Sequence, residues 1–409
     1  MTRPVVIVDP LSSGVELAPA FNARGIPCVA VSTFEARSSL GYGTSLQKQH
    51  FSEIIVGGPD LEEKLRKLNP LAIIPGTDGA MAVAESLAAA LTPQFSNDPL
   101  KNIHRLHKSK MQEALIEAGI PALETMSSSS EREVECWLNE KKLNLSPLVV
   151  KPANSAGSDN VFLIPASGDW RTAFRRVLSE PSKLSGKFHE TAVVQEQALG
   201  TEFAIGTVSS NGKHYLGQII QYTKGTAENR SVVYDYVEFV PYNEQLHGEM
   251  WRYTQRVLGA LGVRWGAAHT EIMLTENGPR LIESSPRMTG GPVVLFAREA
   301  SGSSQADKWA EAIALGEVAT KELTWRKTVM PVFIRAKANG VVRNAEALEG
   351  IRSLATLFKE FLWFKNGDTL NETVDYLSSI GIVALSGKRE DVLRDKKKIR
   401  EMEARLVLG

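Results

Sequence analysis

The stretch AHTEIMLTENGPRLIESSPR, residues 268–287, contains two apolar strands on either side of a turn-forming segment. Pro279 cannot donate a ladder hydrogen bond, so the pattern predicts a longer loop centred on Asn277 rather than a tight Asn-Gly turn. Such a loop places Glu271 directly opposite Glu283. Opposed like charges destabilise a hairpin unless a cation lies between them, and carboxylate oxygens favour Mg²⁺ or Mn²⁺. The stretch therefore predicts a metal-binding face.

The same hairpin carries further polar side chains. Strand alternation puts Ser285 and Arg287 on the face of Glu283. The predicted surface thus combines two carboxylates, a hydroxyl and a fixed positive charge. The alternative is an exposed edge strand with scattered charges.

Upstream, Leu148-Val-Val-Lys151-Pro reads as a strand that ends in a lysine, and a loop of small residues, 153–160, leads to a second strand at 161–164. Such a loop can turn backbone N–H groups toward phosphate oxygens while Lys151 supplies positive charge. It is not a Walker loop, because the G-x-x-x-x-G-K-[ST] pattern is absent. A plain β-hairpin is the alternative.

Residues 192–205 read as a strand, an irregular hinge and another strand. The hinge frees backbone groups that can pair with an adenine edge, and Glu202 can accept hydrogen bonds from both ribose hydroxyls. A solvated turn explains the same residues.

The first hundred residues alternate strands and helices, which predicts a doubly wound parallel sheet. Expected strands are 5–8, 26–31, 53–56 and 71–75, and expected helices are 17–24, 60–68 and 78–91. The first turn lacks G-x-G-x-x-G, so a scaffold is favoured over a dinucleotide site. Asp78 follows the fourth strand at the ligand-binding edge of such sheets, although a helix N-cap is the simpler interpretation.

Composition excludes several classes of protein. The chain has 409 residues, 43% hydrophobic and 23% charged, with 47 basic and 47 acidic residues. Charge balance argues against nucleic-acid binding, and no apolar run approaches the ~18 residues of a membrane span. Two cysteines, Cys28 and Cys136, cannot build a disulfide framework, so we expect a soluble cytoplasmic enzyme.

In this order and spacing, the elements resemble the ATP-grasp superfamily of carboxylate–amine ligases, and most closely the L-amino acid ligases that make dipeptides. The resemblance implies a multidomain α/β and α+β fold: an N-terminal α/β domain (1–105), a lid region with the phosphate loop (106–190), a central ATP-grasp domain (191–330) and a C-terminal cap (331–409). It also implies ATP, Mg²⁺ or Mn²⁺, small amino-acid substrates and a possible homodimer.

The resemblance assigns roles residue by residue. For the nucleotide it implies Lys108, Lys151, Ser155, Gly157, Ser158, Gln195, Glu196, Ala198 and Glu202; for metal it implies Glu271, Glu283 and Ser285. Arg287, with Lys151 and Ser155, is the expected catalytic set. A histidine precedes Lys108 where the family usually has aspartate, Gln195 stands where glutamate is common, and Ser285 replaces the usual asparagine.

The substrate is less well determined by the sequence. Candidate contacts are Asp78, Asp235, His269, Arg287, Gly290, Gly291 and Asp375. Gly290 and Gly291 leave room for a sizeable amino acid, although a tight turn explains them equally well. Asp235 could hold an ammonium group, but surface carboxylates on strands are commoner. Asp375 could pair with a basic carboxyl donor such as arginine or lysine.

Three other classes compete with the dipeptide ligase. A carboxylase or purine-biosynthesis enzyme would use the same nucleotide site with a different acceptor. A non-catalytic ATP-binding protein would have little need for Glu271, Glu283 and Arg287 together. A structural α/β protein would need none of these residues.

Overall fold

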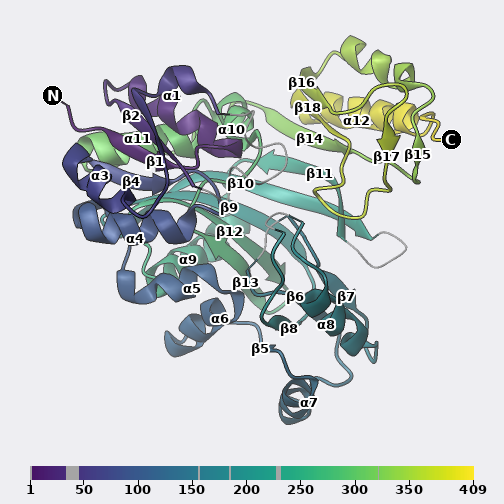
Figure 1. The fold of residues 1–409 in the computed structure, drawn as a ribbon. Helices are drawn as coiled ribbons and strands as arrows, with labels where there is room; N and C mark the ends of the chain where they lie inside the picture. Colours follow the sequence, from purple (N-terminus) through teal and green to yellow (C-terminus); the bar gives the residue numbers. More distant parts are fainter. Residues whose placement is uncertain (1, 34–45, 155–156, 184–185, 227–231, 321) are drawn as a thin grey trace.

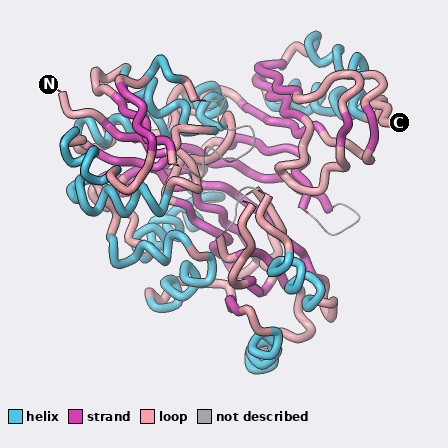
Figure 2. The backbone as a smooth tube through the Cα atoms, in the orientation of Figure 1, coloured by secondary structure: helices cyan, strands magenta, loops and turns pink. Residues whose placement is uncertain are grey.

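The structure is a computed structural model that describes residues 2–33, 46–154, 157–183, 186–226, 232–320 and 322–409. Within these residues the chain forms a four-stranded parallel sheet near the N-terminus, a small four-stranded sheet, an eight-stranded sheet and a two-stranded ribbon (Figure 1). Figure 2 shows the strands of the large sheet running between the N-terminal helices and the C-terminal part. None of the helices described is long and apolar enough to cross a membrane.

The N-terminal sheet confirms the predicted doubly wound start of the chain. Its strands are all parallel in the order β3-β2-β1-β4, with bounds β1 Val5–Val8, β2 Cys28–Ser32, β3 Glu53–Val56 and β4 Ala72–Pro75. Val5 and Ile7 pack on the side of helix α1 (Leu17–Asn22), whereas Val6 and Val8 pack on the side of α3 (Leu61–Leu68) and α4 (Met81–Leu91). Both faces of β1 are buried, which is why its sequence is continuously apolar.

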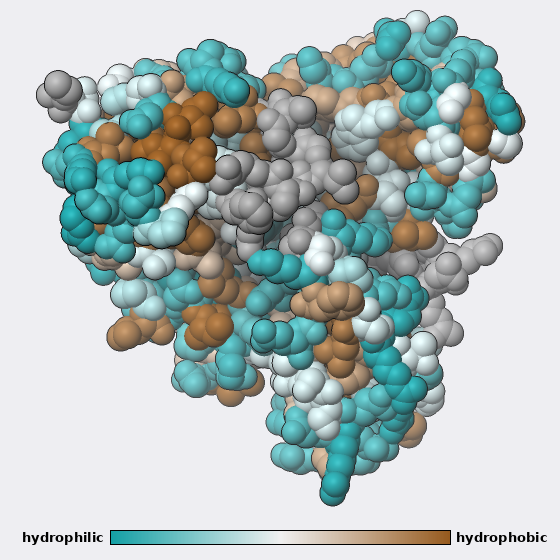
Figure 3. Space-filling model, viewed as in Figure 1, coloured by the Kyte–Doolittle hydropathy of each residue, from teal (hydrophilic) through white to brown (hydrophobic). Residues whose placement is uncertain are grey.

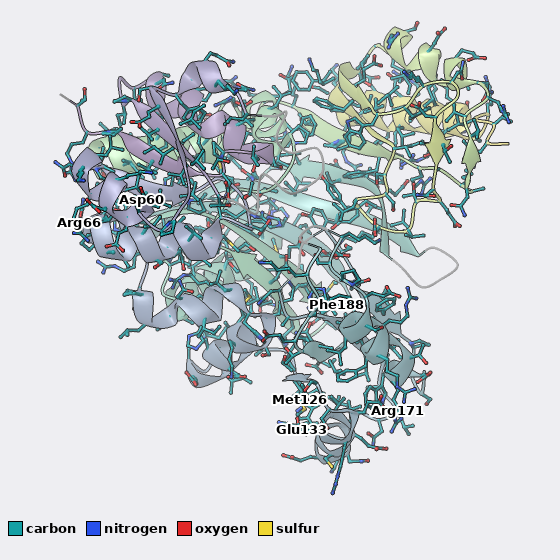
Figure 4. The ribbon with its side chains drawn as sticks, in the orientation of Figure 1. Asp60, Arg66, Met126, Glu133, Arg171 and Phe188 are labelled. Carbon is teal, nitrogen blue, oxygen red and sulfur yellow. The ribbon has the colours of Figure 1, made fainter. Side chains whose placement is uncertain are left out.

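The small sheet forms a lobe at the lower end of Figure 1. Its order is β5-β8-β6-β7, with bounds β5 Thr125–Ser128, β6 Leu148–Pro152, β7 Phe162–Ile164 and β8 Ala192–Glu196. Helices α7 (Glu131–Glu140) and α8 (Trp170–Ser179) cover it with Val134, Leu138, Phe174 and Val177. Ser130 caps α7 by accepting a hydrogen bond from the Glu133 backbone N–H at 3.4 Å; Glu133 is labelled in Figure 4. The lower tip of the lobe is mainly hydrophilic in Figure 3.

The eight-stranded sheet is the largest structural unit of the described chain. All its neighbouring strands are antiparallel, in the order β13-β12-β9-β10-β11-β14-β18-β16. The bounds are β9 Thr201–Ser210, β10 Lys213–Thr226, β11 Val232–Val240, β12 Gly266–Thr275, β13 Gly278–Ser285, β14 Thr328–Ile334, β16 Leu357–Leu362 and β18 Gly381–Gly387.

The remaining elements surround this sheet. The α-helices are α5 Asn102–Leu106, α6 Lys108–Glu117, α9 Glu244–Ala260, α10 Val293–Ser301, α11 Gln305–Leu315 and α12 Arg389–Glu403, and the ribbon joins β15 Gly340–Val341 to β17 Thr369–Leu370. Short 3-10 helices lie at Ser12–Glu16, Lys48–His50, Pro93–Phe95, Pro99–Lys101 and Ala345–Ser353. Leu115 of α6 and Leu258 of α9 pack in one core with Ile205 and Ile272, which fixes α6 against the sheet.

The sheet connections bear on where the domains divide. β8 belongs to the small sheet, so we propose that the lid region extends past residue 190 to Glu196. β14 spans the expected boundary at 330/331 and pairs with both β11 and β18. We therefore propose that the C-terminal part is a continuation of the central sheet rather than a detached cap.

Candidate active site

Two cavities meet at the edge of the large sheet. The larger one, about 670 Å³, lies between the small sheet and strands β9, β10, β12 and β13. The smaller one, about 220 Å³, is lined by residues of the N-terminal part, of β10 to β14 and of the C-terminal part. Five residues line both cavities: Gly157, Tyr222, Tyr234, Glu271 and Glu283. Two of the three predicted metal ligands, Glu271 and Glu283, therefore stand where the cavities join.

The hairpin of β12 and β13 brings Glu271 opposite Glu283, as predicted, but by a different route. Thr275 pairs with Gly278, so the turn contains only Glu276 and Asn277, and the expectation of a longer loop is wrong. Pro279 is tolerated because β13 is an edge strand of the sheet. A register shift next to Glu271, where Ile272 pairs with Leu281, inserts one extra residue and restores the pairing of the two carboxylates.

Each carboxylate of this pair has a positively charged or donor neighbour. Glu283 Oε2 lies 2.9 Å from Lys108 Nζ, at the start of α6. Glu271 Oε1 lies 3.1 Å from His269 Nε2, and His269 Nδ1 lies 3.1 Å from Thr289 Oγ1. Burial opposes ionisation of Glu271, but the bond to His269 and the charges of Lys224 and Arg287 lower its pKa to about 2. The site therefore holds Glu271 as a carboxylate at neutral pH.

The donor set fits a hard divalent cation that is shared with a phosphate ligand. Among the described residues, no group of three or more His, Cys, Asp and Glu side chains forms a closed metal site. Mg²⁺ at nucleotide sites is usually held by one or two carboxylates and completed by phosphate oxygens and water. Glu271 and Glu283 supply that number of carboxylates.

Lys151 lies deep in the larger cavity, on β6, and its side chain is buried. Its Nζ donates to Gln195 Oε1 at 2.8 Å, and Gln195 Nε2 donates in turn to Thr125 Oγ1 at 2.8 Å. Burial, helped by the charge of Lys108, lowers the Lys151 pKa to about 8. Burial of the charged Lys151 side chain is therefore energetically unfavourable in the ligand-free site, and an anionic ligand would offset this desolvation.

The hinge after β8 lines the larger cavity from Glu196 to Glu202. The Glu196 N–H donates to the carbonyl of Glu124 at 3.0 Å, and its carboxylate accepts from the Glu124 N–H at 3.0 Å. This N–H is therefore occupied, which argues against its use by an adenine edge. Gly157 and Ser158 face the same cavity, whereas Ser155 lies outside the described residues.

Lys224 on β10 is a site residue that the sequence analysis missed. Its Nζ lies 2.5 Å from Glu202 Oε1 and sits over the rings of Tyr222 and Tyr234, at 4.8 and 4.6 Å from their centroids. Burial opposes the charge, but Tyr234, Glu202 and Glu271 raise the Lys224 pKa. The alternation of Tyr222 and Lys224 was a usable signal for a shared face. The contact of that face with Glu202 becomes visible only when β10 pairs with β9, the strand that carries Glu202.

Arg287 anchors the polar end of the smaller cavity. Its Nη2 lies 2.7 Å from Asp78 Oδ2, and its Nη1 donates to the Met288 carbonyl at 2.8 Å. Arg287 Nε is buried and has no hydrogen-bond partner among the residues described. The neighbouring carboxylates, Asp78 foremost, raise the Arg287 pKa against the opposing effect of burial, so the guanidinium remains charged.

Asp78 is therefore a cavity residue rather than the helix cap that the sequence favoured. Helix α4 begins at Met81, its N-cap is Ala80, and no side chain caps it. The N-cap interpretation was wrong because it considered only the local sequence, whereas the partner, Arg287, is more than 200 positions away.

Two glycines border the smaller cavity. The Gly291 N–H donates to Ser12 Oγ at 3.0 Å, which ties this turn to the N-terminal part. Gly291 has φ +69°, and a Cβ there would meet the Tyr376 hydroxyl at 3.0 Å, so the turn itself requires glycine. Gly290 has open space around its Cα. The tight-turn interpretation applies to Gly291, and room for a large substrate beside Gly290 stays a prediction.

Three candidate residues are not brought to the cavity walls. Asp235 pairs with Arg400 at 2.6 Å and Arg335 at 3.5 Å and lines neither cavity, so the structure does not support a substrate contact there. Asp375 also lines neither one; its Oδ2 lies 2.5 Å from Lys183 Nζ. Ser285 is buried and outside both linings, and the structure assigns it no metal contact.

The chain is similar to known proteins. The family described as the ATP-grasp domain matches residues 145–294. Dapdiamide A synthase from Enterobacter agglomerans is 29% identical over 412 residues, covering 98% of this chain and 96% of that protein.

Solved structures share the fold along the whole chain. The L-amino acid ligase from Bacillus licheniformis has a TM-score of 0.74 at 17% identity, covering 100% of this chain and 98% of that one. Carboxyaminoimidazole ribonucleotide synthase from Aspergillus clavatus, solved with ATP, has a TM-score of 0.70 at 15% identity, covering 99% of each chain. The chain thus contains an ATP-grasp domain at residues 145–294 and is an ATP-dependent carboxylate–amine ligase.

Proposed function

We propose that the enzyme joins the carboxylate of one L-amino acid to the amine of another through an acyl phosphate and releases a dipeptide, ADP and phosphate. The observation that carries this proposal is the meeting of two cavities at Glu271 and Glu283. One cavity is large enough for a nucleotide, and the other is of amino-acid size. Their junction is where a transferable phosphoryl group and a carboxylate would meet.

The larger cavity supplies groups suited to ATP. Lys108 and Lys151 would neutralise phosphate oxygens, and backbone N–H groups near Gly157 and Ser158 would add donors. The Glu196 carbonyl and Ala198 would pair with adenine, with Glu202 at the ribose. Glu271 and Glu283 would hold Mg²⁺, which polarises the terminal phosphoryl group when it is bound.

The reaction then follows from the residues at the junction. A carboxylate oxygen of the donor attacks the terminal phosphorus, and the bond to the leaving ADP oxygen breaks. The acceptor amine attacks the acyl carbon, loses a proton, and expels phosphate. Arg287, held by Asp78 and close to the Glu271 and Glu283 pair, would stabilise the oxyanion that forms at the acyl carbon.

The relatives support an amino-acid substrate without fixing which one. The L-amino acid ligase is named for its amino-acid substrates, and dapdiamide A synthase is named for its product. The fold shared with carboxyaminoimidazole ribonucleotide synthase keeps a purine-biosynthesis ligase as the alternative. A cytoplasmic location and a homodimer remain predictions.

A basic carboxyl donor, predicted from Asp375, is not part of this proposal. The Asp375 carboxylate is 4% exposed and is engaged by Lys183 Nζ and by Ser378, whose Oγ donates at 2.7 Å. A substrate guanidinium or ammonium would have to displace both partners. We infer that Asp375 supports the contact between the small sheet region and the C-terminal part.

The test is an incubation of the enzyme with ATP, Mg²⁺ and pooled L-amino acids, followed by phosphate assay and mass spectrometry. We expect ADP and phosphate in equal amounts, together with masses equal to two amino acids minus one water. Omission of the amino acids should reduce phosphate release to background. Turnover only with bicarbonate or an amino-ribonucleotide would contradict the proposal and indicate a carboxylase or a purine-biosynthesis ligase.

A further inference from the structure

We infer that the carboxyl donor carries an uncharged, apolar side chain, aliphatic or aromatic, that occupies the smaller cavity. This inference rests on the proposed function and specifies its substrate class. It is carried by the division of the cavity wall into a polar end and an apolar chamber.

The polar end comprises the charged side chains of this lining, which form two groups. Arg287 contacts Asp78, Glu271 contacts His269, and Glu271 stands opposite Glu283 on the hairpin. Glu271 and Glu283 also line the larger cavity. Since a phosphoryl group can arrive only from that side, the donor carboxylate must lie at this end.

The rest of the lining, called the chamber here, is built from aromatic and aliphatic side chains, of which Tyr222 and Tyr234 also line the larger cavity. Tyr234 is the centre of the aromatic group, with ring centroids 5.6 Å from Tyr222, 5.3 Å from Phe333 and 5.5 Å from Tyr376. The aliphatic part of the wall includes Ile220, Val237, Val293, Pro331, Leu377 and Ile382. Most of these side chains come from β10, β11, β14 and β18, so a rigid sheet rather than a loop shapes the chamber.

Charge argues against a charged donor side chain in this chamber. Among the described residues that line the smaller cavity, the acidic and basic side chains are Asp78, His269, Glu271, Glu283 and Arg287, and all of them belong to the polar end. A buried charge without a partner is strongly unfavourable. The faces of Tyr222 and Tyr234 could attract a cation, but Lys224 already lies over both rings and would repel a second one.

The volume restricts the donor further. A cavity of about 220 Å³ is below the ~300–1,000 Å³ of pockets for larger ligands, so one amino acid fits and a nucleotide does not. Burial of an apolar side chain contributes a favourable binding free energy that is roughly proportional to the area that the chamber removes from water. Larger apolar donors should therefore be preferred over alanine until the chamber is full.

Hydroxylamine makes the donor testable without knowledge of the acceptor, because it traps an acyl phosphate as a hydroxamate. We would measure kcat/KM for hydroxamate formation with saturating ATP and Mg²⁺ and with alanine, leucine, methionine, phenylalanine, lysine, arginine or glutamate. We expect leucine, methionine or phenylalanine to exceed each charged donor tenfold or more. Hydroxamate from charged amino acids alone would overturn this inference and keep the proposed function. No hydroxamate and no ADP with any amino acid would overturn both.

A variant of the chamber provides an independent check. Val293, half-buried at the start of α10, lines the smaller cavity, and Val293→Phe reduces its volume. We expect kcat/KM to fall about tenfold for phenylalanine and leucine and much less for alanine. Val407→Phe, an exposed position outside both cavities, is the matched control and should leave all donors unchanged. An equal loss of kcat/KM for every donor in a folded Val293→Phe enzyme would show that the donor side chain does not occupy this cavity, and would contradict the inference.

Discussion

Glu283→Gln is expected to lower kcat for ADP formation at least a thousandfold while the protein remains folded. The amide removes a negative ligand from the junction of the two cavities, and a metal-bridged phosphoryl transfer loses several kcal/mol of transition-state stabilisation without it. The fold should tolerate the change because two effects oppose each other. Repulsion from Glu271 is relieved, while the ion pair with Lys108 is weakened.

Glu276→Gln is the matched control for this prediction. Glu276 is exposed in the two-residue turn of the same hairpin, so its replacement removes the same charge without touching the cavities. Steady-state ADP release and thermal unfolding would be measured for both variants. Wild-type turnover by Glu283→Gln, or equal losses in the two variants, would contradict the assignment of the hairpin as the metal-binding face.

Lys151→Met should have opposite effects on activity and on stability. Loss of the buried cation is expected to lower kcat/KM for ATP about 10²–10³-fold, because removal of one hydrogen-bond donor to a charged transition state typically lowers the rate by that factor. The same change should stabilise the ligand-free protein at pH 7, because the lowering of the Lys151 pKa from 10.5 to about 8 corresponds to about 3 kcal/mol of unfavourable burial. Lys110→Met, on the exposed face of α6, is the control.

The pH dependence has a definite sign. The folded pKa lies below the unfolded value, so between pH 8 and 10.5 the unfolded chain binds more protons, and the contribution of Lys151 to unfolding free energy rises with pH. Activity moves the other way: kcat/KM for ATP, which reports the free enzyme, should fall as pH rises through about 8. Lys151→Arg should abolish that fall. A pH profile unchanged by Lys151→Arg would exclude Lys151 as the titrating group.

The sequence predicted features that depend on local pattern. The parallel strands near the N-terminus are mainly apolar, and the observed bounds of β1 and β3 coincide with the expected ones. The hairpin of β12 and β13 is predicted from two apolar strands on either side of a turn-forming segment. Its pairing of Glu271 with Glu283 was predicted correctly although the turn was not, because the shifted register near Glu271 compensates for the shorter turn.

Features set by long-range contacts were not predictable in the same way. Asp78 looks like a helix cap until β4 is placed beside Arg287. Lys224 looks like an ordinary strand residue until the pairing of β10 with β9 brings it to Glu202. Asp375 was expected to meet a substrate, but folding brings Lys183 to it first. In each case the deciding partner is remote in sequence, and no spacing rule identifies it.

The most direct test of the account follows one oxygen atom. The donor amino acid is supplied with ¹⁸O in both carboxylate positions, and the released phosphate is analysed by mass spectrometry. If the carboxylate attacks the terminal phosphorus, a donor oxygen bridges carbon and phosphorus and leaves with phosphate when the amine displaces it. We predict one ¹⁸O in the phosphate for each amide formed. Unlabelled phosphate, or label in AMP accompanied by pyrophosphate, would contradict the acyl-phosphate mechanism.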